Sequence, residues 1–133
     1  MKLYYMPGAC SLAELIVLQW VRVPHQAVRM NARTIRSAQY LALNAGGNVP
    51  LLQHGDLALT ENVAILGYLA DRFPKARLLG DRTPRGRAEV MQWLGFLNSD
   101  VHTAFMPLFT PPRFLPDPVC APALAAASRA RIR

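Results

Sequence analysis

Cys10 and Ser11 follow a Pro-Gly pair at the point where a helix is expected to begin. The free N–H groups and the dipole of a helix N-terminus favour an anion, so a thiol there is expected to ionise more easily than usual, and the thiolate is the nucleophilic form. The other interpretation is a buried, inert cysteine that only fills space in a core. The local sequence leaves both open, although Pro-Gly favours an exposed loop.

A second candidate is the segment Asn48-Val49-Pro50, which enters an expected strand. The Val49–Pro50 bond can be cis, which would turn the N–H and C=O groups of Val49 sideways, where a peptide-like ligand can pair with them. An ordinary trans proline at the start of a strand is the simpler alternative.

A third candidate is Thr60-Glu61-Asn62, at another expected helix start. Backbone N–H groups and the Asn62 amide can bind a carboxylate there, and Glu61 can receive an ammonium group. Plain capping explains Thr60 but says less about its two neighbours. A thiol, an exposed peptide group and an acid–amide pair suit a small zwitterionic peptide.

The elements that must position these groups follow the order β-α-β-α-β-β-α. We expect strands over 2–5, 25–30, 51–53 and 57–59, with a tight turn over 54–56. Helices are expected from about Cys10 or Ser11 to Arg22, over 37–43, and from Thr60 to Phe73. Ser11 and Glu14 have the spacing of a capping box, and Thr60 is a good N-cap. This order predicts an α/β domain with a mixed sheet, and it places all three candidates at one edge.

A Pro-, Gly- and charge-rich stretch then predicts a boundary, which divides the chain into 1–74, a linker over 75–84 and a helical part over 85–133. A long helix is expected over 84–109, kinked or ended by Pro107, and another from residue 121. The apolar stripe of the helix over 84–109 comprises Val90, Trp93, Leu94, Leu97, Val101 and Phe105. The last helix has little to pack on, so we expect a truncated chain or one that completes its core by self-association.

Composition narrows the function classes. The 133 residues carry a formal charge of +7 that is spread along the chain without a nucleic-acid motif, so we read it as a solvated basic surface. No apolar run is long enough for a membrane span, and the N-terminal one is too short for a signal peptide, which makes a cytoplasmic protein the default. Cys10 and Cys120 lie far apart and the three histidines are isolated, so neither a disulfide nor a metal site is expected.

Four segments, "KLYYMPGACSLA", "LALNAGGNVPLL", "LTENVAILGYLADRFP" and "MQWLGFLNSDVHTAFMPLF", together resemble bacterial glutathione S-transferases of the beta class. The match in order and spacing runs over about 1–114. The resemblance implies a thioredoxin-like N-terminal domain followed by the start of an all-helical domain. It also implies a homodimer, with glutathione as co-substrate and no other cofactor. The family continues through further helices, so the resemblance implies C-terminal truncation.

The resemblance also implies roles for single residues. Cys10 would lie near the glutathione sulfur and form a mixed disulfide with it, with Ser11 and His102 as further candidate catalytic residues. Val49, before a cis Pro50, would pair with the cysteinyl part of glutathione. Glu61 and Asn62 would hold the γ-glutamyl end of glutathione, and Arg36 or Arg33 would bind its glycine carboxylate. A hydrophobic electrophile would lie against Phe105, Met106 and Phe109.

This chain departs from the beta-class pattern at Ile35, Asn62, Gly95 and Thr103. The leading hypothesis is a transferase that conjugates glutathione to hydrophobic electrophiles, a detoxification chemistry, with thiol–disulfide exchange through Cys10 as a second activity. The alternatives are a glutathione-dependent disulfide reductase, a non-catalytic glutathione-binding or interaction protein with the same fold, and a degraded reading frame whose product barely folds.

Overall fold

The computed structural model describes residues 1–81, 83–115 and 117–132. The chain forms two compact units, one spanning Met1–Arg87 and the other beginning at Ala88. Each unit is described by itself.

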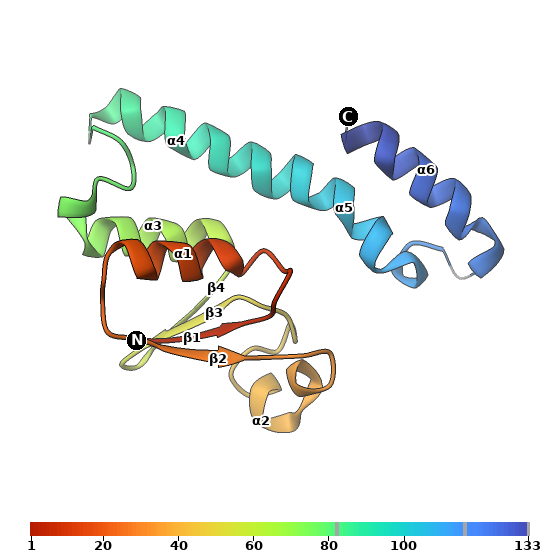
Figure 1. Ribbon diagram of the computed structural model, residues 1–133, viewed down its shortest axis with the longest axis horizontal. Coiled ribbons are helices and arrows are strands. Elements are labelled where there is room, and N and C mark those ends of the chain that lie inside the picture. Colours follow the sequence, from red (N-terminus) through yellow and green to blue (C-terminus); the bar gives the residue numbers. More distant parts are fainter. Residues whose placement is uncertain (82, 116, 133) are drawn as a thin grey trace. The chain divides into compact units, whose positions relative to one another are not determined.

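The first unit is built on a four-stranded mixed sheet with the strand order β2-β1-β3-β4 (Figure 1). The strands are β1 (Lys2–Tyr5), β2 (Gln26–Arg29), β3 (Leu51–His54) and β4 (Leu57–Thr60). β1 pairs in parallel with β2 and antiparallel with β3, so that Leu3 stands between Ala27 and Leu52. β3 and β4 form a hairpin that is closed by Gly55 and Asp56, and Gly55 takes the positive φ of 64° that a tight hairpin turn requires.

Helices cover both faces of this sheet (Figure 1). α1 (Leu12–Trp20) and α3 (Asn62–Arg72) pack side by side on one face. Their apolar stripes bury a core made of Leu3, Leu18, Leu52, Ile65 and Leu69, each at most 1% exposed. The short helix α2 (Ala38–Leu41) lies on the opposite side, where a smaller cluster holds Met30, Tyr40, Val49 and Leu51. The predicted order β-α-β-α-β-β-α and the mixed sheet are confirmed.

Two predicted helix starts are wrong in their detail. Ser11 stands at the N-cap of α1 but its side chain makes no capping bond, because its backbone is helical (φ −58°, ψ −5°) rather than extended. The capping box with Glu14 is therefore absent. Thr60 is the last residue of β4, paired with Leu51, and the N-cap of α3 is Glu61.

The second unit is helical. α4 (Pro84–Phe96), whose first residues belong to the first unit, runs into a π-helical turn over Leu97–Val101 and then into α5 (His102–Phe109). The predicted long helix over 84–109 is thus confirmed with a wide turn inside it, and Pro107 lies within α5, two residues before its end. α6 (Ala121–Ile132) packs against α5. None of the described helices has the length and apolar character needed to cross a membrane.

Candidate glutathione site

The thiol of Cys10 lies in the turn between β1 and α1, two residues before the helix begins. The side chain of Ser11 shapes this turn: its hydroxyl accepts a bond from the Met6 N–H at 3.1 Å and donates to the Met6 carbonyl at 3.4 Å. Ser11 is fully buried, whereas Cys10 is partly exposed. The turn therefore leaves Cys10 partly exposed, while the neighbouring hydroxyl is used to fold the backbone.

Val49, which is 39 residues further along the chain, contacts this thiol through its backbone. The Cys10 Sγ donates to the Val49 carbonyl at 3.6 Å, and the Val49–Pro50 peptide bond is cis, as predicted. The preceding residue is held by two bonds to the Asn48 carbonyl, from the Tyr40 hydroxyl at 2.6 Å and the Asn44 amide at 2.9 Å. Among the described residues the Val49 N–H has no hydrogen-bond partner. The structure therefore leaves a backbone donor unpaired next to the thiol.

Asn62 completes the group as the first residue of α3. Its side chain hydrogen-bonds the Cys10 sulfur, while its Oδ1 is buried and has no partner among the described residues. Glu61, just before it, is exposed and has φ 72° and ψ 124°, a conformation that only a few per cent of non-glycine residues share. Strained residues of this kind concentrate at functional sites. The structure thus brings Cys10, Val49 and Asn62 together.

The electrostatics of this thiol differ from the prediction. Burial, the largest effect, raises the pKa of Cys10, and the negative charge of Glu14 raises it further. The hydrogen bond from Asn62 and the backbone N–H groups of Cys10 and Ser11 lower it, but they do not compensate. The expectation of an unusually acidic thiol is therefore wrong, because desolvation of the thiolate outweighs the donors at the helix start.

The other predicted residues lie elsewhere. Arg36 is exposed at the end of a 3-10 turn over Thr34–Arg36, with its guanidinium against the backbone of Gly47. In the second unit, His102 is the first residue of α5, the rings of Phe105 and Phe109 stack with centroids 6.3 Å apart, and Met106 is partly buried. The roles of these residues stay predictions.

Glu14 is a residue that sequence reasoning assigned to the wrong task. It is fully buried, both carboxylate oxygens lack a partner among the described residues, and burial raises its pKa to about 7. Leu18, four residues later on the same face of α1, is fully buried as well. This helical spacing was the signal that could have identified a carboxyl in the core.

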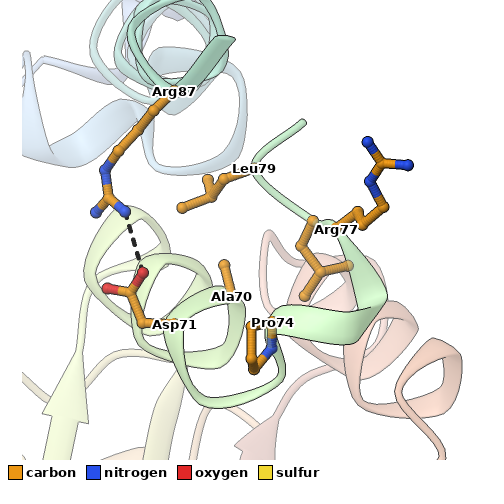
Figure 2. Close-up of a pocket in the computed structure, with 7 residues that line it drawn as sticks. Ala70, Asp71, Pro74, Arg77, Leu79 and Arg87 are labelled. Carbon is orange, nitrogen blue, oxygen red and sulfur yellow. Dashed lines mark hydrogen bonds and ion pairs between the residues drawn. The ribbon is translucent and has the colours of Figure 1, made fainter. Parts of the chain in front are cut away.

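Two of the cavities formed by described residues lie within the first unit. One, of about 200 Å³, is at the C-terminal end of α3, where Figure 2 shows Arg87 reaching to Asp71 beside Ala70, Pro74 and Leu79. The other, of about 390 Å³, is lined by Met6, Pro7 and the residues Arg29 to Ala32, so it borders the turn that carries Cys10. Neither cavity is lined by any of the predicted site residues.

Comparison with known proteins agrees with this geometry. Residues 1–71 match the family described as "Glutathione S-transferase, N-terminal domain", and the chain belongs to this glutathione S-transferase family. The predicted thioredoxin-like fold of the first unit and the resemblance to the beta class are confirmed by this family match and by similar solved structures.

The curated glutathione S-transferase GST-4.5 of Xanthomonas campestris is 51% identical over 109 residues, which cover 82% of this chain and 53% of that protein. The solved glutathione S-transferase from Xylella fastidiosa superposes with a TM-score of 0.92 at 40% identity, over 98% of this chain and 64% of the other. For the beta-class enzyme of Sphingomonas chungbukensis the TM-score is 0.83 at 36% identity, over 99% and 64% of the two chains. The chain spans about half the length of the curated relatives it matches.

Proposed function

We propose that this protein is a glutathione S-transferase of the cysteine type, in which glutathione binds beside Cys10 and its thiolate attacks a hydrophobic electrophile. The observation that carries the proposal is the convergence of Cys10, Val49 and Asn62 from three separate segments on one point. The free N–H of Val49 and the unpartnered Oδ1 of Asn62 are polar groups that a peptide ligand would satisfy.

In this proposal Val49 pairs its backbone with the cysteinyl part of glutathione, next to Pro50. Glu61 and Asn62 hold the γ-glutamyl end, and Arg36 binds the glycine carboxylate. The glutathione sulfur then forms a bond to the electrophilic carbon as the leaving group departs with its electron pair. His102 would polarise the thiol, and Phe105, Met106 and Phe109 would line the electrophile site.

Thiol–disulfide exchange is the second reaction that we assign to Cys10. Its thiolate attacks oxidised glutathione, which forms a Cys10–glutathione disulfide and releases one glutathione thiolate, so the electrons balance without another oxidant. Because the pKa of Cys10 is raised, most of the group is a thiol at neutral pH, and the exchange should accelerate as the pH rises.

The experiment that tests the site uses a Cys120→Ala variant, in which Cys10 is the remaining thiol. After treatment with oxidised glutathione, mass spectrometry should find one glutathione adduct in Cys120→Ala and none in the Cys10→Ala/Cys120→Ala double variant. Glutathione binding by calorimetry should survive in the double variant. Absence of an adduct at Cys10 across the alkaline range would overturn its assignment.

A non-catalytic glutathione-binding protein is the second candidate, favoured by the raised pKa of Cys10, which leaves little thiolate at neutral pH. Retention on a glutathione resin, without turnover of an aryl halide or of a mixed disulfide, would favour this second candidate.

Together with the leading function we propose that the protein is a cytoplasmic homodimer that acts in detoxification. We also propose a glutathione-binding domain over 1–74, a linker over 75–84 and a helical domain over 85–133.

A further inference from the structure

Glu14 is a buried acid without a structural explanation. Its side chain is fully inaccessible, and neither oxygen has a hydrogen-bond partner among the described residues. An ionised carboxylate in such a place lacks both solvent and a counter-charge, so the proton is retained to about pH 7. This carboxyl lies in the first turn of α1 and makes no hydrogen bond to the described residues, so its effect must come from its charge on the groups nearby.

The neighbour that its charge affects is Cys10. The thiol stands four residues earlier, in the turn before α1, where the Cys10 carbonyl accepts a bond from the Ala13 N–H at 3.1 Å, next to Glu14 in the chain. The Glu14 carboxylate is the charged group that raises the pKa of this thiol. The interaction is reciprocal, since two groups that repel each other as anions must lose their protons in succession. Asn62 acts on the same sulfur in the opposite sense, as a hydrogen-bond donor.

The main elements packed against α1 are β1 and α3. Glu61, the exposed residue before α3, is a further acid near this end of α1, and the described titratable side chains of the two elements have contacts of their own. On β1, Lys2 lies over the Tyr4 ring, the Tyr4 hydroxyl bonds Gln53, and Tyr5 packs against the apolar core. On α3, Tyr68 bonds His54 at 2.6 Å, Asp71 pairs with Arg87, and Arg72 lies beside the Phe73 ring.

We propose that Glu14 is a positioning residue that controls the protonation of Cys10, so that the segment from Cys10 to Glu14 holds one negative charge at a time. As the pH rises, Glu14 gives its proton to solvent first, and the buried carboxylate then opposes loss of the Cys10 proton. Burial of the thiol and the Glu14 carboxylate together keep Cys10 as a thiol near neutral pH, so that it reacts chiefly under alkaline conditions. This inference rests on the proposed function only in that it regulates the same thiol.

The test measures the reactivity of Cys10 without glutathione, so its outcome is independent of the transferase proposal. In a Cys120→Ser background, the alkylation rate with iodoacetamide is followed from pH 6 to 10 in the parent, in Glu14→Gln and in Asp56→Asn. The last variant removes an exposed carboxyl in the β3–β4 turn and is the matched control. Glu14→Gln should shift the profile to lower pH and raise the rate at pH 8 by about two- to tenfold. Asp56→Asn should match the parent.

Coincident profiles for the parent and Glu14→Gln would overturn the proposal. A second measurement does not depend on a variant: the side-chain carbon signal of Glu14 in nuclear magnetic resonance should titrate near pH 7. A midpoint near the ordinary glutamate value, about 4.3, would equally overturn it. If glutathione fails to bind while the alkylation profiles differ, the transferase proposal falls and this inference stands.

Discussion

The two units of this chain differ in how they use apolar side chains. The first buries leucines and isoleucine completely between a sheet and two helices. From Ala88 onward, the buried residues among those described are Ala104 and Ser128, whereas Trp93, Phe109 and Val119 are 63%, 70% and 81% exposed. Burial of apolar area is the main stabilising contribution to a fold, so the first unit is expected to carry most of the stability. The second depends on helical hydrogen bonds and on α5 packing against α6.

The candidate site follows the same division. Cys10, Val49 and Asn62 meet on turns that the sheet and its helices hold in place, a common arrangement of functional residues on a rigid scaffold. The predicted electrophile residues belong to the unit with little core. We expect changes in the first unit to have the larger effects, and the following variants test this comparison.

The largest effect is expected from truncating a buried leucine. Leu69→Ala in α3, at 0% exposed, should lower the free energy of unfolding by about 2–5 kcal/mol, because it removes packed methyl groups and leaves a cavity. Leu97→Ala in the second unit, at 48% exposed, is the matched control and should cost less than about 1 kcal/mol. Urea denaturation measures both, and equal losses would break the comparison.

The next effect concerns Glu14 and has a defined pH dependence. Its pKa of about 7 in the folded state lies above 4.5, so between these values the folded state holds a proton that the unfolded state loses. The free energy of unfolding should therefore fall as the pH rises from 4.5 to 7, by about 3 kcal/mol in all. Glu14→Gln should remove this slope and Asp56→Asn should keep it. An unchanged slope in urea denaturation of Glu14→Gln would show that Glu14 is not the cause.

A smaller effect is expected at the loop before Val49. Tyr40→Phe removes the hydroxyl that donates to the Asn48 carbonyl at 2.6 Å and should cost about 1 kcal/mol. The aromatic contact with Tyr4, at 5.4 Å between centroids, is kept. Thermal denaturation gives the stability, and calorimetry should show weaker glutathione binding if this bond positions Val49. Tyr5→Phe is the control, and identical behaviour of both variants would argue against a positioning role for Tyr40.

The smallest effect is expected from the ion pair at the cavity of Figure 2. The side chains of Arg87 and Asp71 are 51% and 64% exposed, so their 3.0 Å contact is screened by water and salt. Asp71→Asn should change the free energy of unfolding by less than about 0.5 kcal/mol, and less still at high salt. A loss above 1 kcal/mol in low-salt thermal denaturation would show that the start of α4 depends on this pair.

Much of the first unit could be predicted because local signals agree with the packing. Pro7 and Gly8 end β1 at Tyr5, as expected, and the hairpin follows from its turn residues. The predicted turn over 54–56 was one residue too long, because His54 still pairs with Leu57 and its ring bonds Tyr68. Tertiary contacts of this kind are invisible to a local pattern.

The site was predictable in its membership but not in its electrostatics. The cis bond before Pro50 was implied by the family resemblance, whereas the local pattern favoured a trans proline, and Cys10 does contact Val49. The pKa of the thiol depends on burial and on Glu14, and the burial of Glu14 depends on packing between distant segments. The sequence pattern predicts the N–H donors at the helix start, which lower the pKa of the thiol. It does not predict the burial that raises this pKa, because burial depends on the whole fold.

The π-helical turn over Leu97–Val101 has a consequence for how α5 is oriented. Each residue of an α-helix advances the side-chain direction by about 100°, so one extra residue in a wide turn rotates everything after it by that angle. The faces of α4 and α5 are consequently out of phase with a regular periodicity. Inserting or deleting one residue in this turn would therefore rotate the side chains of α5, His102 among them, by about 100° without altering the residues of the helix.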